Sequence, residues 1–183
     1  MPISSCPTFA PQGARQGGDL IAYSKVFDGV LVAKGNPKGI KGVDLSLCGA
    51  AAAENTGYFE APLVGDLSEP GKKAGKAEAT LPLFDNKADC IRAIQAGRAD
   101  TYVNDLNSVD QAVKVNSDKL EKAAAVSIPW SAGLATPKDK SKFRAAVMAA
   151  MILLQKDGAD MALLKKYNAD VNNFKEPEVL TAD

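Results

Sequence analysis

Residues 90–109 read CIRAIQAGRADTYVNDLNSV, and the pattern of this stretch predicts the class of fold. Apolar residues at helical spacing indicate a helix over 88–96, which Gly97 is expected to end in the C′ position. Residues 101–104 (TYVN) have the composition of a buried strand, and a second helix is predicted over 107–115. A helix, a strand and a helix in direct succession are typical of an α/β fold.

The same alternation continues on both sides of this stretch. Residues 47–54 (LCGAAAAE) combine alanines, which favour helix, with flanking turn residues, which favour a short buried strand, and we interpret them as a strand. A helix is expected to begin near Tyr58 with Asn55 or Thr56 as its N-cap, and 66–76 is expected to be an exposed connection. Further strands are predicted at 29–34, 78–84, 123–128 and 132–135. Strands alternating with helices predict a mainly parallel sheet flanked by helices.

The last part of the chain is predicted to be helical from Asp139 onward. Asp157 and Gly158 interrupt the pattern, and a second helix is expected to run to about Tyr167. The apolar residues of the first helix form one stripe at helical spacing: Phe143, Ala146, Val147, Ala150, Met151 and Leu154.

The composition excludes several classes of function. Lys plus Arg and Asp plus Glu are both 22, so neither a general nucleic-acid binder nor a polybasic membrane-surface protein is expected. The sequence has no histidine, which excludes histidine-based acid–base chemistry and most catalytic zinc sites. Three widely spaced cysteines form neither a disulfide framework nor a metal pair, so no cofactor and no metal are expected. No apolar run is long enough to span a bilayer.

Two turns that follow predicted strands form the candidate site. Asn55, Thr56 and Gly57 follow one strand, and Asp105 follows the strand at 101–104. In a parallel sheet both turns lie at the carboxyl edge, where ligands bind. Backbone N–H groups of the first turn suit a carboxylate and Asp105 suits an ammonium group, which together describe a receptor for an α-amino acid. The alternative is that both turns only cap helices.

Five segments, in the correct order, resemble family 3 of the type II periplasmic solute-binding proteins, which deliver amino acids to ABC transporters. The segments are PTFAPQGARQGGDLIAYSKVF (7–27), GVLVAKGNPKGIKGVDL (29–45), LCGAAAAENTG (47–57), the stretch 90–109 and LATPKDKSKFRAAVMAAMILLQKDGADMALLKKYN (134–168). The resemblance implies a lobe two over 30–131 with an α/β fold. It also implies that 1–29 is an arm left from lobe one, that 132–183 is the crossover and helical pair of lobe one, and that the start of that lobe is missing.

The resemblance also implies roles for the site residues. Asp105 would hold the amino group of the ligand, and Thr56 with its neighbours Asn55 and Gly57 would bind the ligand's carboxylate. Arg15 would pair with that carboxylate, for which a guanidinium fork is suited. A solvated arginine without ligand contact is the alternative for Arg15.

The resemblance therefore implies a component of an ABC transporter that binds an amino acid or another small polar solute, or a truncated remnant of such a component, that works with a permease and is not an enzyme. A periplasmic location follows from the resemblance, although no signal peptide is visible, which leaves a cytoplasmic location open. The alternatives are an oligomeric interaction module that has lost ligand binding and, less favoured, an enzyme like the cyclohexadienyl dehydratases. A homodimer is predicted because the resemblance packs the Phe143 stripe on a lobe-one sheet that is mostly absent. The competing expectation is that this helix folds back on its own lobe or on residues 1–28.

Overall fold

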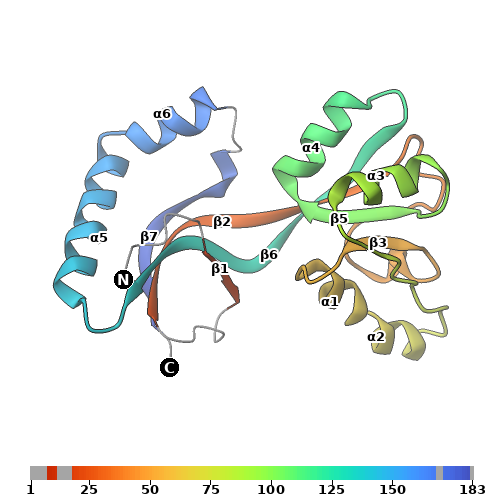
Figure 1. Cartoon of the computed structure of the whole chain (residues 1–183), viewed down its shortest axis with the longest axis horizontal. Helices are drawn as coiled ribbons and strands as arrows, with labels where there is room; N and C mark the ends of the chain where they lie inside the picture. The colour runs from red at the N-terminus through yellow and green to blue at the C-terminus, as the bar shows by residue number, and fades with distance from the viewer. Residues whose placement is uncertain (1–7, 12–17, 168–170, 182–183) are drawn as a thin grey trace. The chain divides into compact units, whose positions relative to one another are not determined.

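A computed structural model describes residues 8–11, 18–167 and 171–181 (Figure 1). The chain divides into two compact units, the first made of residues 1–26 and 127–183 and the second of residues 27–126. Two long strands, β2 (Gly18–Ala33) and β6 (Leu120–Pro137), continue from one unit into the other. The assignment of these units to the predicted lobes stays a prediction.

The second unit is built on a sheet with a parallel centre. Strand β3 (Ala52–Asn55) pairs in parallel with both β4 (Leu83–Phe84) and β5 (Thr101–Asp105). Strand β2 pairs antiparallel with β5, with Val30 opposite Val103, and β6 follows β2 in the strand order. The predicted sheet that joins the strand after Gly29 to the TYVN strand is therefore confirmed.

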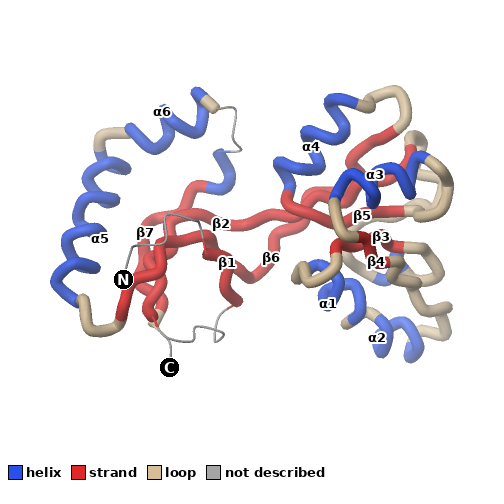
Figure 2. The backbone as a smooth tube through the Cα atoms, viewed as in Figure 1, coloured by secondary structure: helices blue, strands red, loops and turns tan. Residues whose placement is uncertain are grey.

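Helices cover both faces of this sheet (Figures 1 and 2). Helices α3 (Lys87–Gln95) and α4 (Leu106–Val115) pack on the face that carries Leu31 and Tyr102. Helices α1 (Glu60–Gly65) and α2 (Ser68–Lys73) lie on the opposite face, where Val64 packs with Val30 and Val103. Successive residues of a strand point to opposite faces, so each strand contributes to both cores. The predicted α/β class, with a mostly parallel sheet flanked by helices, is confirmed.

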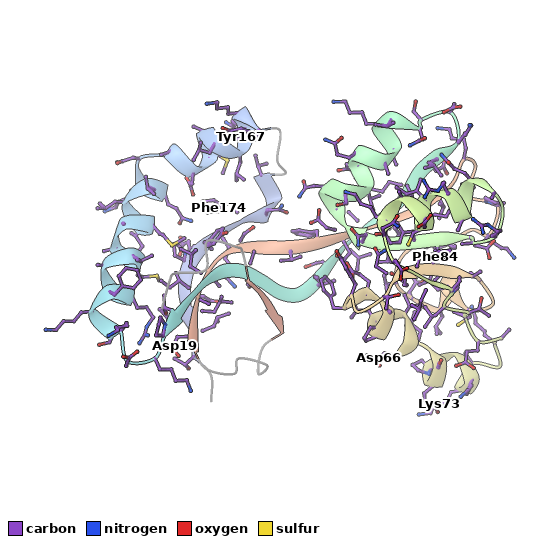
Figure 3. The ribbon with its side chains drawn as sticks, in the orientation of Figure 1. Asp19, Asp66, Lys73, Phe84, Tyr167 and Phe174 are labelled. Carbon is purple, nitrogen blue, oxygen red and sulfur yellow. The ribbon has the colours of Figure 1, made fainter. Side chains whose placement is uncertain are left out.

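The first unit combines antiparallel strand pairs with the two C-terminal helices. Strand β1 (Thr8–Pro11) pairs with β6, and β7 (Phe174–Leu180) pairs with β2. Helix α5 (Ser141–Lys156) contacts both β7 and α6 (Ala159–Lys166), and Figure 3 shows Phe174 on β7 and Tyr167 just after α6. Arg144 of α5 forms a largely buried ion pair with Asp19 of β2, with 2.7 Å between Nη1 and Oδ2, which ties the helix to the strand.

Short one-turn helices complete the element order. Residues Leu45–Leu47 and Val171–Asn173 are 3₁₀ helices. The first is capped by Asp44, whose side chain accepts a hydrogen bond from the backbone N–H of Ser46.

Several local expectations are wrong. The N-cap of α1 is Phe59, without a side-chain capping bond, and neither Asn55 nor Thr56 caps the helix. Residues 66–76 are largely exposed, as expected, but they contain α2 instead of a plain connection. Pro70 is tolerated there because it lies in the first turn of the helix, where its missing N–H is not needed. The strands predicted at 123–128 and 132–135 are one continuous strand. Residues 78–84 contribute only β4, and β7 was not predicted.

The close approach of β2 to α4 depends on Gly29. A Cβ atom at Gly29 would lie 2.6 Å from the Cβ atom of Val109. We therefore expect Gly29→Ala to lower the free energy of unfolding by about 1–3 kcal/mol. Gly65→Ala is the control, because a Cβ atom there would meet no heavy atom within 4 Å. Urea unfolding followed by circular dichroism should find the control as stable as the wild type or better, and equal stability of the two variants would contradict the close packing.

Candidate functional site

The carboxyl ends of β3 and β5 lie at the same edge of the sheet. The two strands run in parallel, with Ala52 opposite Thr101 and Ala53 opposite Tyr102. The Asn55-Thr56-Gly57 turn at the end of β3 and Asp105 at the end of β5 therefore come to one edge. The roles predicted for them stay predictions, and the predicted Arg15 lies outside the described residues.

Asp105 is the N-cap of α4. Its Oδ1 atom accepts a hydrogen bond of 3.1 Å from the backbone N–H of Ser108. The side chain is half-buried, and its carboxylate lies at the positive end of a ten-residue helix, where a negative charge is favoured. Asp105 therefore caps the helix, which the sequence had left as the alternative to ligand binding. The capping bond uses one of the two carboxylate oxygens.

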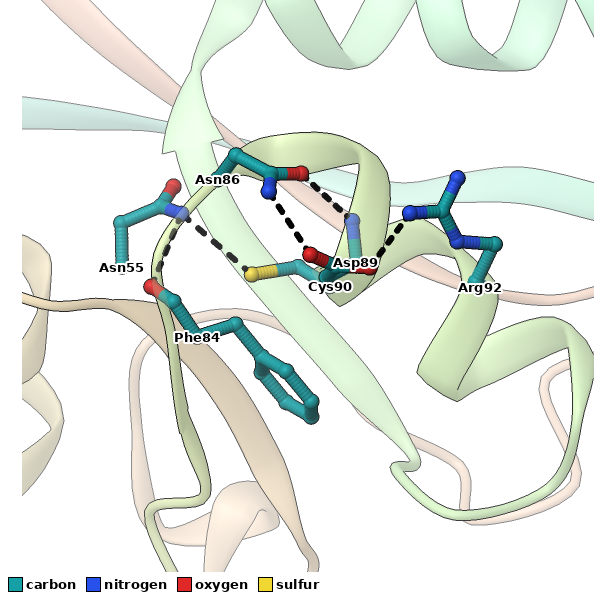
Figure 4. A network of polar contacts seen from close by, with 6 residues as sticks. All are labelled: Asn55, Phe84, Asn86, Asp89, Cys90 and Arg92. Atoms are coloured by element: carbon teal, nitrogen blue, oxygen red, sulfur yellow. Dashed lines mark hydrogen bonds and ion pairs between the residues drawn. The ribbon is translucent and has the colours of Figure 1, made fainter.

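The turn after β3 is held by bonds to its neighbours (Figure 4). Asn55 is buried, and its Oδ1 atom accepts a hydrogen bond of 2.5 Å from the Tyr102 hydroxyl, while its Nδ2 atom donates to the carbonyl of Phe84 and, weakly, to the sulfur of Cys90. The backbone N–H of Thr56 donates to the same carbonyl at 2.9 Å. The N–H of Thr56 is therefore not free for a ligand, and the Thr56 hydroxyl donates a longer hydrogen bond of 3.4 Å to the same carbonyl, although Thr56 and Gly57 are both exposed.

The start of α3 fixes the position of Cys90 beside this turn. Asn86 caps the helix, since its Oδ1 atom accepts a hydrogen bond of 3.0 Å from the backbone N–H of Asp89. Asp89 also forms an ion pair with Arg92 one turn later, as Figure 4 shows. The cap and the ion pair begin α3 at Lys87 and turn Cys90 toward the buried side of the helix, where it meets Asn55.

Three buried carboxyl groups at this edge were not predicted as site residues. Asp28 on β2 is the register partner of Asp105, Glu54 lies directly before Asn55, and Glu60 is the first residue of α1. The exposed fractions are 0% for Asp28, 0% for Glu54 and 1% for Glu60. We call Asp28, Glu54, Glu60 and Asp105 the acidic cluster.

The buried members of the acidic cluster have few hydrogen-bond partners. One oxygen of Glu54 accepts from the backbone N–H of Val103 at 3.4 Å, and one oxygen of Glu60 accepts from the amide of Asn104 at 3.3 Å. Within the described part of the chain, neither oxygen of Asp28 and neither Oε2 atom of the two glutamates accepts any hydrogen bond.

Burial and mutual repulsion raise the pKa values of these three groups. Burial, together with the charge of Asp105, raises the pKa of Asp28 to about 7. Burial, together with the charges of Glu60 and Asp28, raises the pKa of Glu54 to about 9. The pKa of Glu60 is raised to about 7, again mainly by burial. Glu54 therefore holds a proton at neutral pH, and Asp28 and Glu60 do so in part.

Among the residues that the structure describes, no group of three or more histidine, cysteine, aspartate or glutamate side chains has an arrangement that could hold a metal ion. In the same part of the chain, no helix combines the length and the apolar character needed to cross a membrane.

The chain has structural relatives but no close sequence relatives in the comparisons. No protein-family model and no curated protein matches it. An ancestral arginine-binding protein bound to arginine is 24% identical with a TM-score of 0.61, and the match covers 80% of this chain and 63% of that one. A putative binding component of an ABC transporter from Wolinella succinogenes DSM 1740, complexed with lysine, is 19% identical with a TM-score of 0.55, covering 90% and 64%.

A third solved structure, the solute receptor for L-cysteine of Neisseria gonorrhoeae, is 22% identical with a TM-score of 0.57, covering 84% of this chain and 57% of the receptor. The chain thus spans less than two thirds of the length of each of these structures. The likeness shows that the chain has the fold of these binding proteins, as the five sequence segments predicted.

The raised pKa values predict that stability falls as pH rises. In the unfolded chain these carboxyl groups ionise near their ordinary pKa values of 3.8 and 4.5, whereas in the folded protein they have pKa values of about 7 to 9. Between these limits the folded state holds more protons, so the free energy of unfolding decreases with pH, and the loss is complete above about pH 9. The expected loss between pH 5 and pH 9 is on the order of a few kcal/mol.

Glu54→Gln tests the origin of this loss, because an amide oxygen can still accept the bond from Val103. The variant should lose less stability than the wild type between pH 5 and pH 9 in urea unfolding experiments. Glu69→Gln, at an exposed position on α2, should keep the wild-type slope. A wild-type stability that rises over this pH range would contradict the protonated cluster.

Proposed function

We propose that the chain is a solute-binding component of an ABC transporter that captures a small polar solute, in the simplest case an amino acid, without changing it chemically. The observation that carries this proposal is the parallel register of β3 and β5, which brings the Asn55–Gly57 turn and Asp105 to one edge of a lobe. It is supported by the fold, which the chain shares with proteins described as bound to arginine, complexed with lysine, or receptors for L-cysteine.

In this proposal the free side of Asp105 receives the ammonium group of the solute. Its Oδ1 atom accepts the capping bond from Ser108, which orients the carboxylate and leaves Oδ2 for the ligand. The Gly57 backbone would bind the solute's carboxylate, and the Thr56 hydroxyl would join it by exchanging its 3.4 Å bond to the Phe84 carbonyl for one to the carboxylate. Asn55 would support the turn through its bond with the Tyr102 hydroxyl. Arg15 would supply the guanidinium partner of that carboxylate.

The same proposal places the protein in the periplasm, where it would hand the solute to a membrane permease. The interaction module without a ligand remains the alternative from another class of function. Thermal-shift screening of the purified protein against the common amino acids separates the two, since a ligand that binds the folded state raises the melting temperature.

We further propose that the protein is a homodimer through α5 and α6. No residue of either helix is buried, and the exposed fractions are 39% for Phe143 and 54% for Leu154. An apolar cavity of about 250 Å³ opens beside them, lined in part by Tyr23, Met151 and Phe174. Because burial of a large apolar side chain contributes about 1.5–3 kcal/mol, a second copy that covers this surface would be substantially stabilised.

Asp105→Asn tests the ammonium site. Asparagine caps helices as well as aspartate does, so the melting temperature without ligand should change little. The variant should lose the ligand-induced rise in melting temperature, because a neutral amide cannot pair with an ammonium group. Asp110→Asn is the control, since this exposed residue lies on the same helix and pairs with Lys122. An unchanged ligand response in Asp105→Asn would remove the residue from the proposed site.

Phe143→Glu tests the dimer. Light scattering at micromolar concentration should give the mass of two chains for the wild type and of one chain for the variant, because a glutamate in an apolar interface loses its hydration without gaining a partner. Ser141→Glu adds the same charge at an exposed position near the start of α5 and should leave the dimer intact. A monomeric wild type, with Phe143→Glu unchanged in solubility and melting temperature, would refute the interface.

A further inference from the structure

We propose that the acidic cluster is a cation-binding site, in which an ammonium or guanidinium group of the solute replaces protons held by Asp28, Glu54 and Glu60. This inference rests on the proposed function for the statement that the ligand is a small solute. The inference goes beyond the proposed function in two ways. It assigns three further residues to the binding site, and it states that the solute carries a cationic group besides the ammonium group at Asp105.

Unpartnered oxygen atoms point to a ligand that donates hydrogen bonds. Both oxygens of Asp28 and the Oε2 atoms of Glu54 and Glu60 are buried and accept no hydrogen bond within the described part of the chain. Proteins satisfy most buried polar atoms, so unpartnered oxygens gathered from β2, β3 and α1 require an explanation. A bound group with several N–H donors would satisfy them together.

The groups that surround these oxygens are acidic or neutral. Asp105 raises the pKa of both Asp28 and Glu60 through its charge, and Glu54 is raised by the charges of Glu60 and Asp28. Cys90 on α3 has its pKa raised to about 12, by burial and then by the charge of Glu54. Burial and then the charges of Cys90, Glu54 and Glu60 raise the pKa of Tyr102 as well, and the amide of Asn104 donates to Glu60. None of the described groups that raise the pKa values of Asp28, Glu54 and Glu60 is cationic, so these carboxyl groups, once ionised, would attract a cation.

The arrangement suits an organic cation and not a metal ion. The described acidic and thiol groups do not converge as metal ligands. An ammonium group has three N–H donors and a guanidinium group has five, in a planar fork, so either can contact oxygens that do not converge on one point. Charge balance requires that each carboxyl group that ionises on binding releases its proton to the solvent. Binding is therefore coupled to proton release, and affinity increases with pH.

Because Glu54 and Glu60 are buried, a bound group would reach them only after movement of the segment between β3 and α1. Thr56 and Gly57 are exposed, and Glu60 follows three residues later at the start of α1. Helix α1 has only six residues and no side-chain capping bond, so its own hydrogen bonds stabilise it weakly. Movement of this segment would uncover both Glu54, at the end of β3, and Glu60.

Calorimetric titration with matched ligands tests the cation site. L-Arginine, L-lysine and agmatine are titrated into the full chain at pH 6, 7 and 8, in buffers that differ in ionisation enthalpy. L-Citrulline, which has the shape of arginine without its charge, is the control ligand. We expect at least one of the cations to bind with net proton release, with an affinity that rises about tenfold per pH unit for each proton released. Citrulline should bind at least about tenfold more weakly, a difference that corresponds to about 1.4 kcal/mol.

Two variants assign the effect to the cluster. Glu54→Gln and Glu60→Gln should each reduce the affinity for the cation by about tenfold and reduce the number of protons released, whereas the exposed Glu69→Gln should change neither. The measurement of proton release on the wild-type chain needs no variant, so it is decisive even if a variant fails to fold.

The outcomes separate the two proposals. If citrulline or another neutral amino acid binds as tightly as the cations, without proton release, the cation site is refuted and the proposed solute-binding function stands. If only neutral amino acids bind, the cation site is likewise refuted and the proposed solute-binding function stands. If neither the cations nor the neutral amino acids bind at any of these pH values, the cation site and the capture of an amino acid are both refuted.

Discussion

The parallel pairing of β3 with β5 is the constraint on which the rest of the second unit depends. It forces two chain segments to leave the sheet at one edge, and it also sets where α1 and α4 begin. Helix α4 starts directly after β5, and α1 starts after the short turn that follows β3, so the sheet brings the starts of both helices to one edge. Side chains in the loops at this edge can therefore change while the strand pairing keeps its position.

The same constraint concentrates negative charge. The antiparallel pairing of β2 with β5 sets Asp28 opposite Asp105, and the end of β3 adds Glu54 to the same region. A protein selected only for stability would fill these positions with apolar residues or supply partners for the carboxyl groups. The four unpartnered oxygens lower the stability of the folded protein, and in the cation site proposed above a bound ligand would offset this loss. Such a loss of stability is common at functional sites.

The sequence predicted those helices and strands that are determined by hydrophobic periodicity and by turn residues close to them in the chain. The helix α3 with Gly97 beyond its end, the strand β5 and the helix α4 follow from periodicity and turn residues, and so does the edge at which Asp105 lies. The acidic cluster could not be predicted in the same way. In the sequence, Asp28 resembles an ordinary turn residue, and Glu60 resembles an ordinary acidic residue in the first turn of a helix. Asp28 is buried only because β2 pairs with β5 in the folded structure. The one sequence signal of a buried carboxyl group was Glu54, because it directly follows a run of four alanines.

The division of the chain into units also has a consequence for the order of folding. The second unit is one continuous segment, residues 27–126, whereas the first needs both ends of the chain. Ser24, for example, donates a hydrogen bond to the carbonyl of Asn173, 149 residues further along. During synthesis all pairings of the second unit become available once residue 126 has left the ribosome, while β2 must wait for β7 until residue 180 has been added. The edge of the sheet that carries Asp105 can therefore form before β2 has paired with β7, and closure of this long loop makes that pairing the slower step.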